Sequence, residues 1–175
     1  MTAELPPGSV VVIDTSVLIA LGTPDNEKFQ RFEEHVTENE IAVRVPGYVA
    51  EELGDAPEDY QYQRERLRAA RDAGWLTSVA VDFENPEVSD IVDRTRERMA
   101  ALAADDISAD QIEKTDTVLA GVACQLAGTQ QGVGVLVSDA LAAEAIGDVL
   151  AAAGHGDIAV VDGREFISEL VDTGV

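Results

Sequence analysis

The stretch that decides the fold is Val10-Val11-Val12-Ile13-Asp14-Thr15-Ser16-Val17-Leu18-Ile19, close to the start of the 175-residue chain. Four β-branched residues in a row indicate a strand that is covered on both faces. A second apolar run follows the acid and the two hydroxyl residues. Asp14 therefore interrupts one of the most apolar parts of the chain, at the point where a strand ends.

Four more short apolar runs resemble this first strand, and stretches with helical apolar spacing lie between them. The predicted strands are 9–13, 41–45, 76–81, 133–137 and 158–161. The predicted helices are 25–39, 47–53, 60–73, 86–104, 109–127, 140–153 and 163–171. Strands that alternate with helices indicate an α/β fold with a parallel sheet and helices on both of its faces. The length and the absence of an internal repeat or long linker predict a single domain over residues 1–175.

The composition has a large excess of acid, with 34 Asp and Glu against 12 Lys and Arg and a net charge of −22. Hydrophobic residues make up 46% of the chain, which excludes a disordered protein. The acids are spread over the whole chain, and only Lys28 and Lys114 are lysines. We interpret the charge as an adaptation to molar salt, where the Debye length falls to about 3 Å. An acidic protein with a basic partner is the alternative.

The chain has few residues that bind soft metals. Its single cysteine, Cys124, excludes a disulfide framework, and two histidines in unrelated contexts argue against a zinc centre. We expect His35 and His155 to lie at the surface and Cys124 to be a small buried hydrophobe. The first residues do not resemble a signal peptide, and no apolar run is long enough to span a membrane. We expect a cytoplasmic protein with no membrane partner.

Four acids interrupt apolar sequence instead of lying on polar faces: Asp14 and Asp139 follow strands directly, and Glu52 and Asp116 lie in helices. Open α/β sheets bind ligands beyond the carboxyl ends of their strands, so Asp14 and Asp139 face each other if the first and fourth strands are neighbours. Two close carboxylates favour a cation between them, and oxygen ligands favour Mg²⁺ or Mn²⁺. The alternative for either aspartate is that it caps the following helix.

The order of these motifs resembles the PIN-domain nucleases. The first strand and its Asp14 are followed by Pro-x-x-Val-x-x-Glu-Leu around Glu52, then by Asp-x-x-Leu-Ala-x-x-Ala from Asp116. The last motif is an apolar strand with Val-Ser-Asp that ends at Asp139. The resemblance extends over residues 10–167, nearly the whole chain.

The resemblance implies a three-layer α/β/α sandwich with a five-stranded parallel sheet of order 3-2-1-4-5. It also implies a ribonuclease that uses Mg²⁺ or Mn²⁺ to hydrolyse RNA phosphodiester bonds. The implied catalytic and metal-binding acids are Asp14, Glu52, Asp116 and Asp139, and the implied supporting hydroxyls are Ser16 and Ser138. Because Glu51 adjoins Glu52, the choice between these two glutamates stays open.

The middle of the chain, about residues 54–112, is longer than in compact toxin-type members and is expected to be a helical elaboration that contains arginines. These arginines either bind RNA phosphates or pair with nearby acids on solvated helix faces. The candidate RNA-binding residues are Arg64, Arg68, Arg71 and Lys114.

Several roles are compatible with this resemblance. The chain is either a toxin neutralised by a small antitoxin protein or an RNA-processing enzyme, and a scaffold that binds RNA or metal with little catalysis is the alternative. Family members commonly form homodimers. The apolar residues Val17, Leu18 and Leu21 either supply such a contact or belong to the core.

Overall fold

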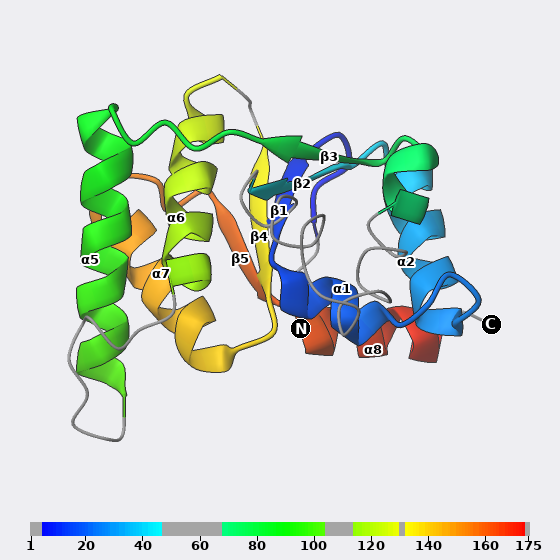
Figure 1. Cartoon of the computed structure of the whole chain (residues 1–175). Coiled ribbons are helices and arrows are strands. Elements are labelled where there is room, and N and C mark those ends of the chain that lie inside the picture. The colour runs from blue at the N-terminus through cyan, green and yellow to red at the C-terminus, as the bar shows by residue number, and fades with distance from the viewer. Residues whose placement is uncertain (1–4, 47–67, 104–113, 130–131, 174–175) are drawn as a thin grey trace, which may run out of the picture.

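The computed structural model describes residues 5–46, 68–103, 114–129 and 132–173. Within them, five strands form one sheet of order β3-β2-β1-β4-β5, and every neighbouring pair is parallel (Figure 1). The expected fold class and strand order are therefore confirmed.

The strands are β1 (Val10–Ile13), β2 (Ala42–Pro46), β3 (Leu76–Val79), β4 (Val133–Val137) and β5 (Ala159–Asp162). The helices are α1 (Thr15–Leu21), α2 (Glu27–Glu38), α5 (Pro86–Leu102), α6 (Lys114–Ala127), α7 (Ala140–Ala152) and α8 (Gly163–Thr173), and residues 68–72 are also helical. Helix α1 is absent from the predicted helices, because its run of apolar residues continues that of the strand before it. The predicted helix at 47–53 lies outside the described residues.

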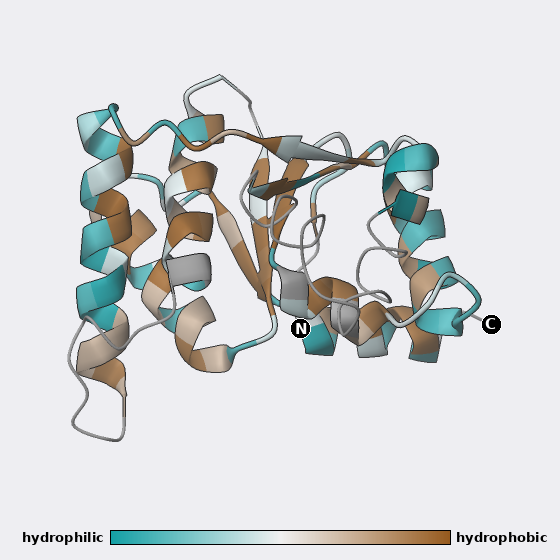
Figure 2. Ribbon diagram, in the orientation of Figure 1, coloured by the Kyte–Doolittle hydropathy of each residue, from teal (hydrophilic) through white to brown (hydrophobic). Residues whose placement is uncertain are grey.

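Alternate residues of the strands point to opposite faces of the sheet, as the pleat requires. In β1, Val11 and Ile13 join a core cluster with residues of α1, α2 and α8, whereas Val12 joins a cluster with residues of α6 and α7. Figure 2 shows this arrangement as hydrophobic strands between helices whose outer sides, on α2 and α5, are hydrophilic. Both faces of the sheet are covered, so the three-layer sandwich is confirmed.

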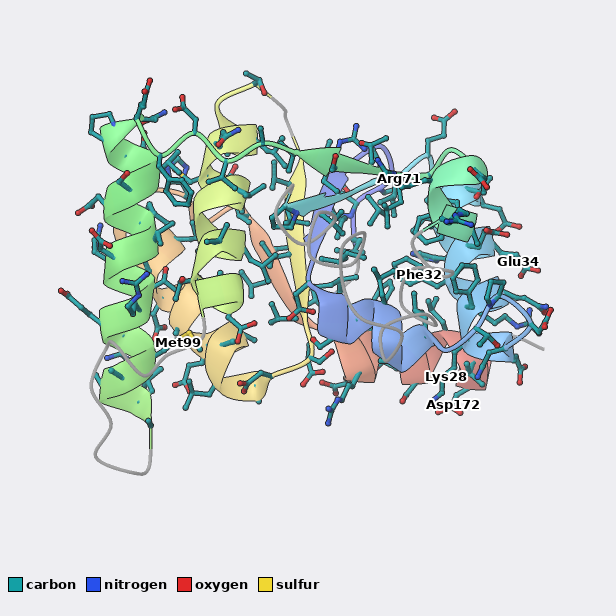
Figure 3. All side chains as sticks on the ribbon, viewed as in Figure 1. Lys28, Phe32, Glu34, Arg71, Met99 and Asp172 are labelled. Carbon is teal, nitrogen blue, oxygen red and sulfur yellow. The ribbon has the colours of Figure 1, made fainter. Side chains whose placement is uncertain are left out.

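Helix α2 illustrates how the acidic surface and the apolar core are separated. Phe32 is fully buried and lies on the side toward the sheet, whereas Glu34 is exposed on the opposite side (Figure 3). Val17, Leu18 and Leu21 of α1 are also fully buried in the same core cluster. These three residues therefore belong to the core and do not form an exposed contact face.

Candidate functional site

Two of the acids predicted to bind metal follow strands that are paired side by side. In the register of β1 and β4, Val12 is opposite Val135 and Ile13 is opposite Leu136. Asp14 follows Ile13 directly, and Asp139 follows the end of β4 by two residues. Both acids therefore lie at the carboxyl edge of the sheet, which we define as the edge where the parallel strands end. The strand order reverses between these two strands, which is where such sheets bind ligands.

Asp14 is buried, with 4% of its surface exposed. Its Oδ1 accepts a hydrogen bond from the Ser16 hydroxyl at 2.5 Å and another from the Val17 backbone N–H at 3.1 Å. The bond from Val17 is that of a helix N-cap on α1. Both of the hydrogen bonds that Asp14 makes with described residues use Oδ1, so Oδ2 is the oxygen that remains for a ligand.

Asp139 is exposed and caps α7, because its Oδ1 accepts a hydrogen bond from the Leu141 backbone N–H at 2.9 Å. The preceding residue, Ser138, has a buried hydroxyl oxygen with no hydrogen-bond partner among the described residues. Burying a hydroxyl without a partner costs free energy, about 1–3 kcal/mol. An unsatisfied polar atom at this edge is consistent with a site that a ligand completes.

Asp116 lies in the first turn of α6 and is half-buried. Helix α6 packs against β1 and β4 and leads into the start of β4, so the helix runs antiparallel to the strand (Figure 1). A helix that ends at the beginning of β4 has its own beginning at the opposite edge. Asp116 therefore belongs to the same carboxyl edge as Asp14 and Asp139.

The structure adds a strand-terminal acid that the sequence analysis did not single out. Asp162 ends β5, which is the neighbour of β4, and is paired with Val137. Its Oδ1 accepts hydrogen bonds from the backbone N–H groups of Arg164 at 2.9 Å and Glu165 at 3.2 Å, so it caps α8. The same pattern of apolar strand followed by Asp, in Val160-Val161-Asp162, is the signal that would have found it.

The three described acids share one edge, but their oxygens are not gathered as metal ligands. Asp14, Asp116 and Asp139 do not form a group of three whose ligand atoms all lie within 4.8 Å, as judged over the described residues. Two of the three carboxylates are oriented by the helices that they cap. The remaining acid of the predicted set, Glu52, lies outside the described residues, as do its neighbour Glu51 and Arg64.

A different group does meet that distance criterion, at the amino edge of the sheet, where the strands begin. Glu87, Cys124 and His155 place their ligand atoms within 4.8 Å of one another. The His155 Nε2 lies 2.7 Å from the Glu87 Oε1 and 3.6 Å from the Cys124 Sγ. Cys124 is buried, as expected, but the sequence analysis argued against a zinc centre and did not anticipate that this residue contacts His155. We call these three residues the Glu87–Cys124–His155 cluster.

The hydrogen bond from His155 lowers the pKa of Glu87, so this carboxyl group stays ionised. Burial, together with the nearby Glu87 carboxylate, raises the pKa of the Cys124 thiol to about 11. The thiol is therefore protonated at neutral pH.

Some of the described arginines of the middle segment form ion pairs with nearby acids. Arg94 lies 3.6 Å from Asp90, and Arg98 lies 2.9 Å from Asp148, both in ion pairs at the surface. Arg68 and Arg71 are exposed. Because Arg71 precedes β3 by five residues, it lies near the beginning of that strand, away from the carboxyl edge (Figure 3). For Lys114, the structure describes the helical backbone alone.

Comparison with protein families gives one result that covers nearly the whole chain. Residues 7–174 match the family model described as "Halobacterial PIN domain". No curated protein and no solved structure matches the chain. Within the part of the chain that the structure describes, none of the helices is long and apolar enough to cross a membrane.

Proposed function

The chain belongs to the halobacterial PIN-domain family, and on this premise we propose that it is a ribonuclease that depends on a divalent metal ion and hydrolyses RNA phosphodiester bonds. PIN domains are a nuclease-type family. The halobacterial character of the family agrees with our interpretation of the net charge of −22 as an adaptation to molar salt.

The observation that carries the proposal is the pairing of β1 with β4, because it brings the ends of two strands that each lead into an aspartate to the same place. Helix α6 begins at the same edge with Asp116. Three acidic residues on or next to three separate elements thus lie at one edge of the sheet, which is where α/β sheets bind their ligands.

The donors at this edge fit a hard divalent cation. Every side chain proposed here offers oxygen, and Mg²⁺ and Mn²⁺ prefer oxygen ligands. Among the described residues, neither the Oδ2 of Asp14 nor the hydroxyl of Ser138 has a hydrogen-bond partner, so both are further oxygens at this edge. Asp14, Glu52, Asp116 and Asp139 would hold the ion. A bound Mg²⁺ or Mn²⁺ ion would activate a water molecule and neutralise charge on the phosphoryl oxygens.

The chain's own side chains would orient these acids. The Ser16 hydroxyl and the Val17 N–H would fix Oδ1 of Asp14, which leaves Oδ2 for a ligand. Four helices, α1, α6, α7 and α8, begin at this edge, and helix N-termini carry partial positive charge. That field favours the carboxylates and an RNA phosphate at the same edge.

Capping alone does not explain why the strand-terminal residues are aspartates. Helices α2 and α5 are capped by Asn26 and Asn85, and asparagine caps a helix about as well as aspartate does. The chain therefore uses neutral caps on these two helices and charged caps after the strands. Asp162 is a charged cap as well, but Asp14 and Asp139 follow the two strands between which the strand order reverses, and this position supports a role for their negative charge.

For Asp14 and Asp139, the test relies on the fact that asparagine caps a helix about as well as aspartate does. Asp14→Asn, Asp116→Asn and Asp139→Asn are compared with wild type in digestion of mixed RNA with Mn²⁺ in molar KCl. We expect the folded variants to lose cleavage while their thermal unfolding stays close to that of wild type. Asp162→Asn is the matched control, because it makes the same change in a helix cap that follows a strand. Asp162 is outside the predicted set of metal-binding acids, so this variant should keep its activity. Equal cleavage by wild type and all three variants would refute the nuclease.

A scaffold that binds RNA with little catalysis is the second candidate. The observation in its favour is that the oxygens of Asp14, Asp116 and Asp139 are not gathered within metal-ligand distances of one another in the described structure. RNA binding by wild type with no metal-dependent cleavage under the same conditions would favour the scaffold over the enzyme.

A further inference from the structure

The Glu87–Cys124–His155 cluster joins three elements that are distant in sequence. Glu87 lies in the first turn of α5, Cys124 lies near the end of α6, and His155 lies in the turn between α7 and β5. Cys124 and His155 are 31 residues apart, and Glu87 and His155 are 68 residues apart. The cluster is at the amino edge, so it is separated from the acids of the carboxyl edge by the length of α6.

The distances in the cluster are close to those of a tetrahedral metal site. With Zn–S near 2.3 Å and Zn–N near 2.0–2.1 Å, a tetrahedral angle places nitrogen and sulfur roughly 3.6 Å apart. The distance between the His155 Nε2 and the Cys124 Sγ is 3.6 Å.

The remaining ligand has to move only slightly. Oxygen and nitrogen ligands of zinc lie roughly 3.3 Å apart by the same geometry, whereas the Glu87 Oε1 is now hydrogen-bonded to the His155 Nε2 at 2.7 Å. Glu87 is exposed, with 58% of its side chain accessible, so its carboxylate is able to withdraw by the required distance of about 0.6 Å.

The chemistry of the donors selects the class of cation. One sulfur, one imidazole nitrogen and one carboxylate oxygen form a set that suits zinc, whereas Mg²⁺ and Mn²⁺ prefer oxygen alone. A nucleophilic role for Cys124 is disfavoured, because the residue is buried and its thiol is protonated at neutral pH.

We propose that Glu87, Cys124 and His155 bind Zn²⁺ at the amino edge of the sheet, with water as the fourth ligand. The ion ties the beginning of α5 and the end of α6 to the turn before β5. On binding, the Cys124 S–H gives up its proton to solvent, the His155 ring proton moves from Nε2 to Nδ1, and the hydrogen bond between His155 and Glu87 is replaced by two bonds to the metal. The site is independent of the proposed nuclease centre.

The test measures metal binding by the full-length protein after chelator treatment, in molar KCl with excess Mg²⁺ to occupy the oxygen sites. Zn²⁺ affinity is measured by competition with a chromogenic chelator, and Co²⁺ is used as a spectroscopic substitute. We expect one Zn²⁺ per chain and, with Co²⁺, a charge-transfer absorption from thiolate to metal. We also expect Zn²⁺ to raise the Tm.

The variants Cys124→Ala, His155→Gln and Glu87→Gln each remove one ligand. Each should weaken Zn²⁺ binding by more than about 100-fold, the upper end of the loss caused by changing a residue that only supports a ligand. The matched control is Glu84→Gln, which removes the same charge from an exposed residue just before α5 and should bind as wild type does. Glu87→Gln changes an exposed residue, so its result stays informative if Cys124→Ala fails to fold.

Two results would overturn the proposal: no thiolate absorption in wild type with Co²⁺, or equal Zn²⁺ affinities of wild type and Glu87→Gln. The first result would mean that the metal binds away from Cys124, and the second that Glu87 is not a ligand. Because no RNA is cleaved in this experiment, its failure is distinguishable from the failure of the proposed function.

Discussion

At the carboxyl edge of the sheet, Asp14, Asp116 and Asp139 offer only oxygen atoms, whereas at the amino edge Glu87, Cys124 and His155 offer oxygen, sulfur and nitrogen. Asp14 and Asp139 follow from local structure, since each comes after a strand and caps the helix that follows. The second set is assembled from a helix start, a helix end and a turn. One sheet thus presents two edges whose donor atoms suit different classes of cation.

The largest expected effect comes from changing one residue at each edge and measuring both properties. Asp14→Asn should lower RNA cleavage by about 10²–10³-fold, the scale of losing one electrostatic contact to a transition state. Its Zn²⁺ affinity should match that of wild type. Cys124→Ala should show the reverse, with normal cleavage in Mn²⁺ and loss of Zn²⁺ binding. If either variant changes both properties, the two edges do not act independently.

The second expected effect is a pH dependence of Zn²⁺ binding at the amino edge. The pKa of the Cys124 thiol is about 11, so Zn²⁺ must displace its proton at lower pH. The apparent Zn²⁺ affinity should therefore rise about tenfold for each unit of pH between about 7 and 9. This is measured by competition titrations at several pH values. A pH-independent affinity in wild type would show that the thiol is not a ligand, and Cys124→Ala provides the baseline.

The third effect concerns the packing that holds the carboxyl edge together. A Cβ on Gly163 would lie 3.0 Å from the Val17 Cγ2 and 3.4 Å from the Val137 carbonyl oxygen. Gly163→Ala should therefore lower the free energy of unfolding by about 1–3 kcal/mol. Gly147→Ala in α7 meets nothing within 4 Å and should raise it by about 0.5–1 kcal/mol. Chemical denaturation of both variants makes this comparison, and equal stabilities would contradict it.

The smallest effect is expected at a pair that belongs to neither edge. Arg98 and Asp148 form an ion pair between α5 and α7, with just under half of each side chain exposed. Arg98→Ala should lower the free energy of unfolding by less than about 1 kcal/mol, and by less still in molar KCl. Thermal unfolding at low and high salt checks this. A larger loss that persists in high salt would mean that Arg98 contributes by packing.

The carboxyl edge could be predicted from sequence because its signals are local. An apolar strand followed within two residues by Asp14 or Asp139 is visible in about ten residues, and the parallel sheet follows from the alternation of strands and helices. Asp162 shows the same apolar strand before it but is followed by Gly163 and two charged residues, so it does not interrupt apolar sequence as Asp14 does. The site roles of Asp14, Asp116 and Asp139 remain predictions, and Glu52 and Arg64 lie outside the described residues.

The amino edge could not be predicted in this way. His155 follows a glycine in a turn, and Cys124 lies in an apolar helix, so each is unremarkable in its own sequence context. Their contact depends on the antiparallel packing of α5 and α6 and on the turn that leads into β5. Packing between distant elements has no local sequence signal.

The capping role of Asp14 and Asp139 has an evolutionary consequence. Aspartate and asparagine codons differ by a single base, and either residue supports the start of the helix. One point mutation would therefore remove the charge from the edge and leave a stable, folded domain behind. Descendants of such a gene would keep the fold and lose the charge, which gives this architecture a short path between a charged and a neutral carboxyl edge.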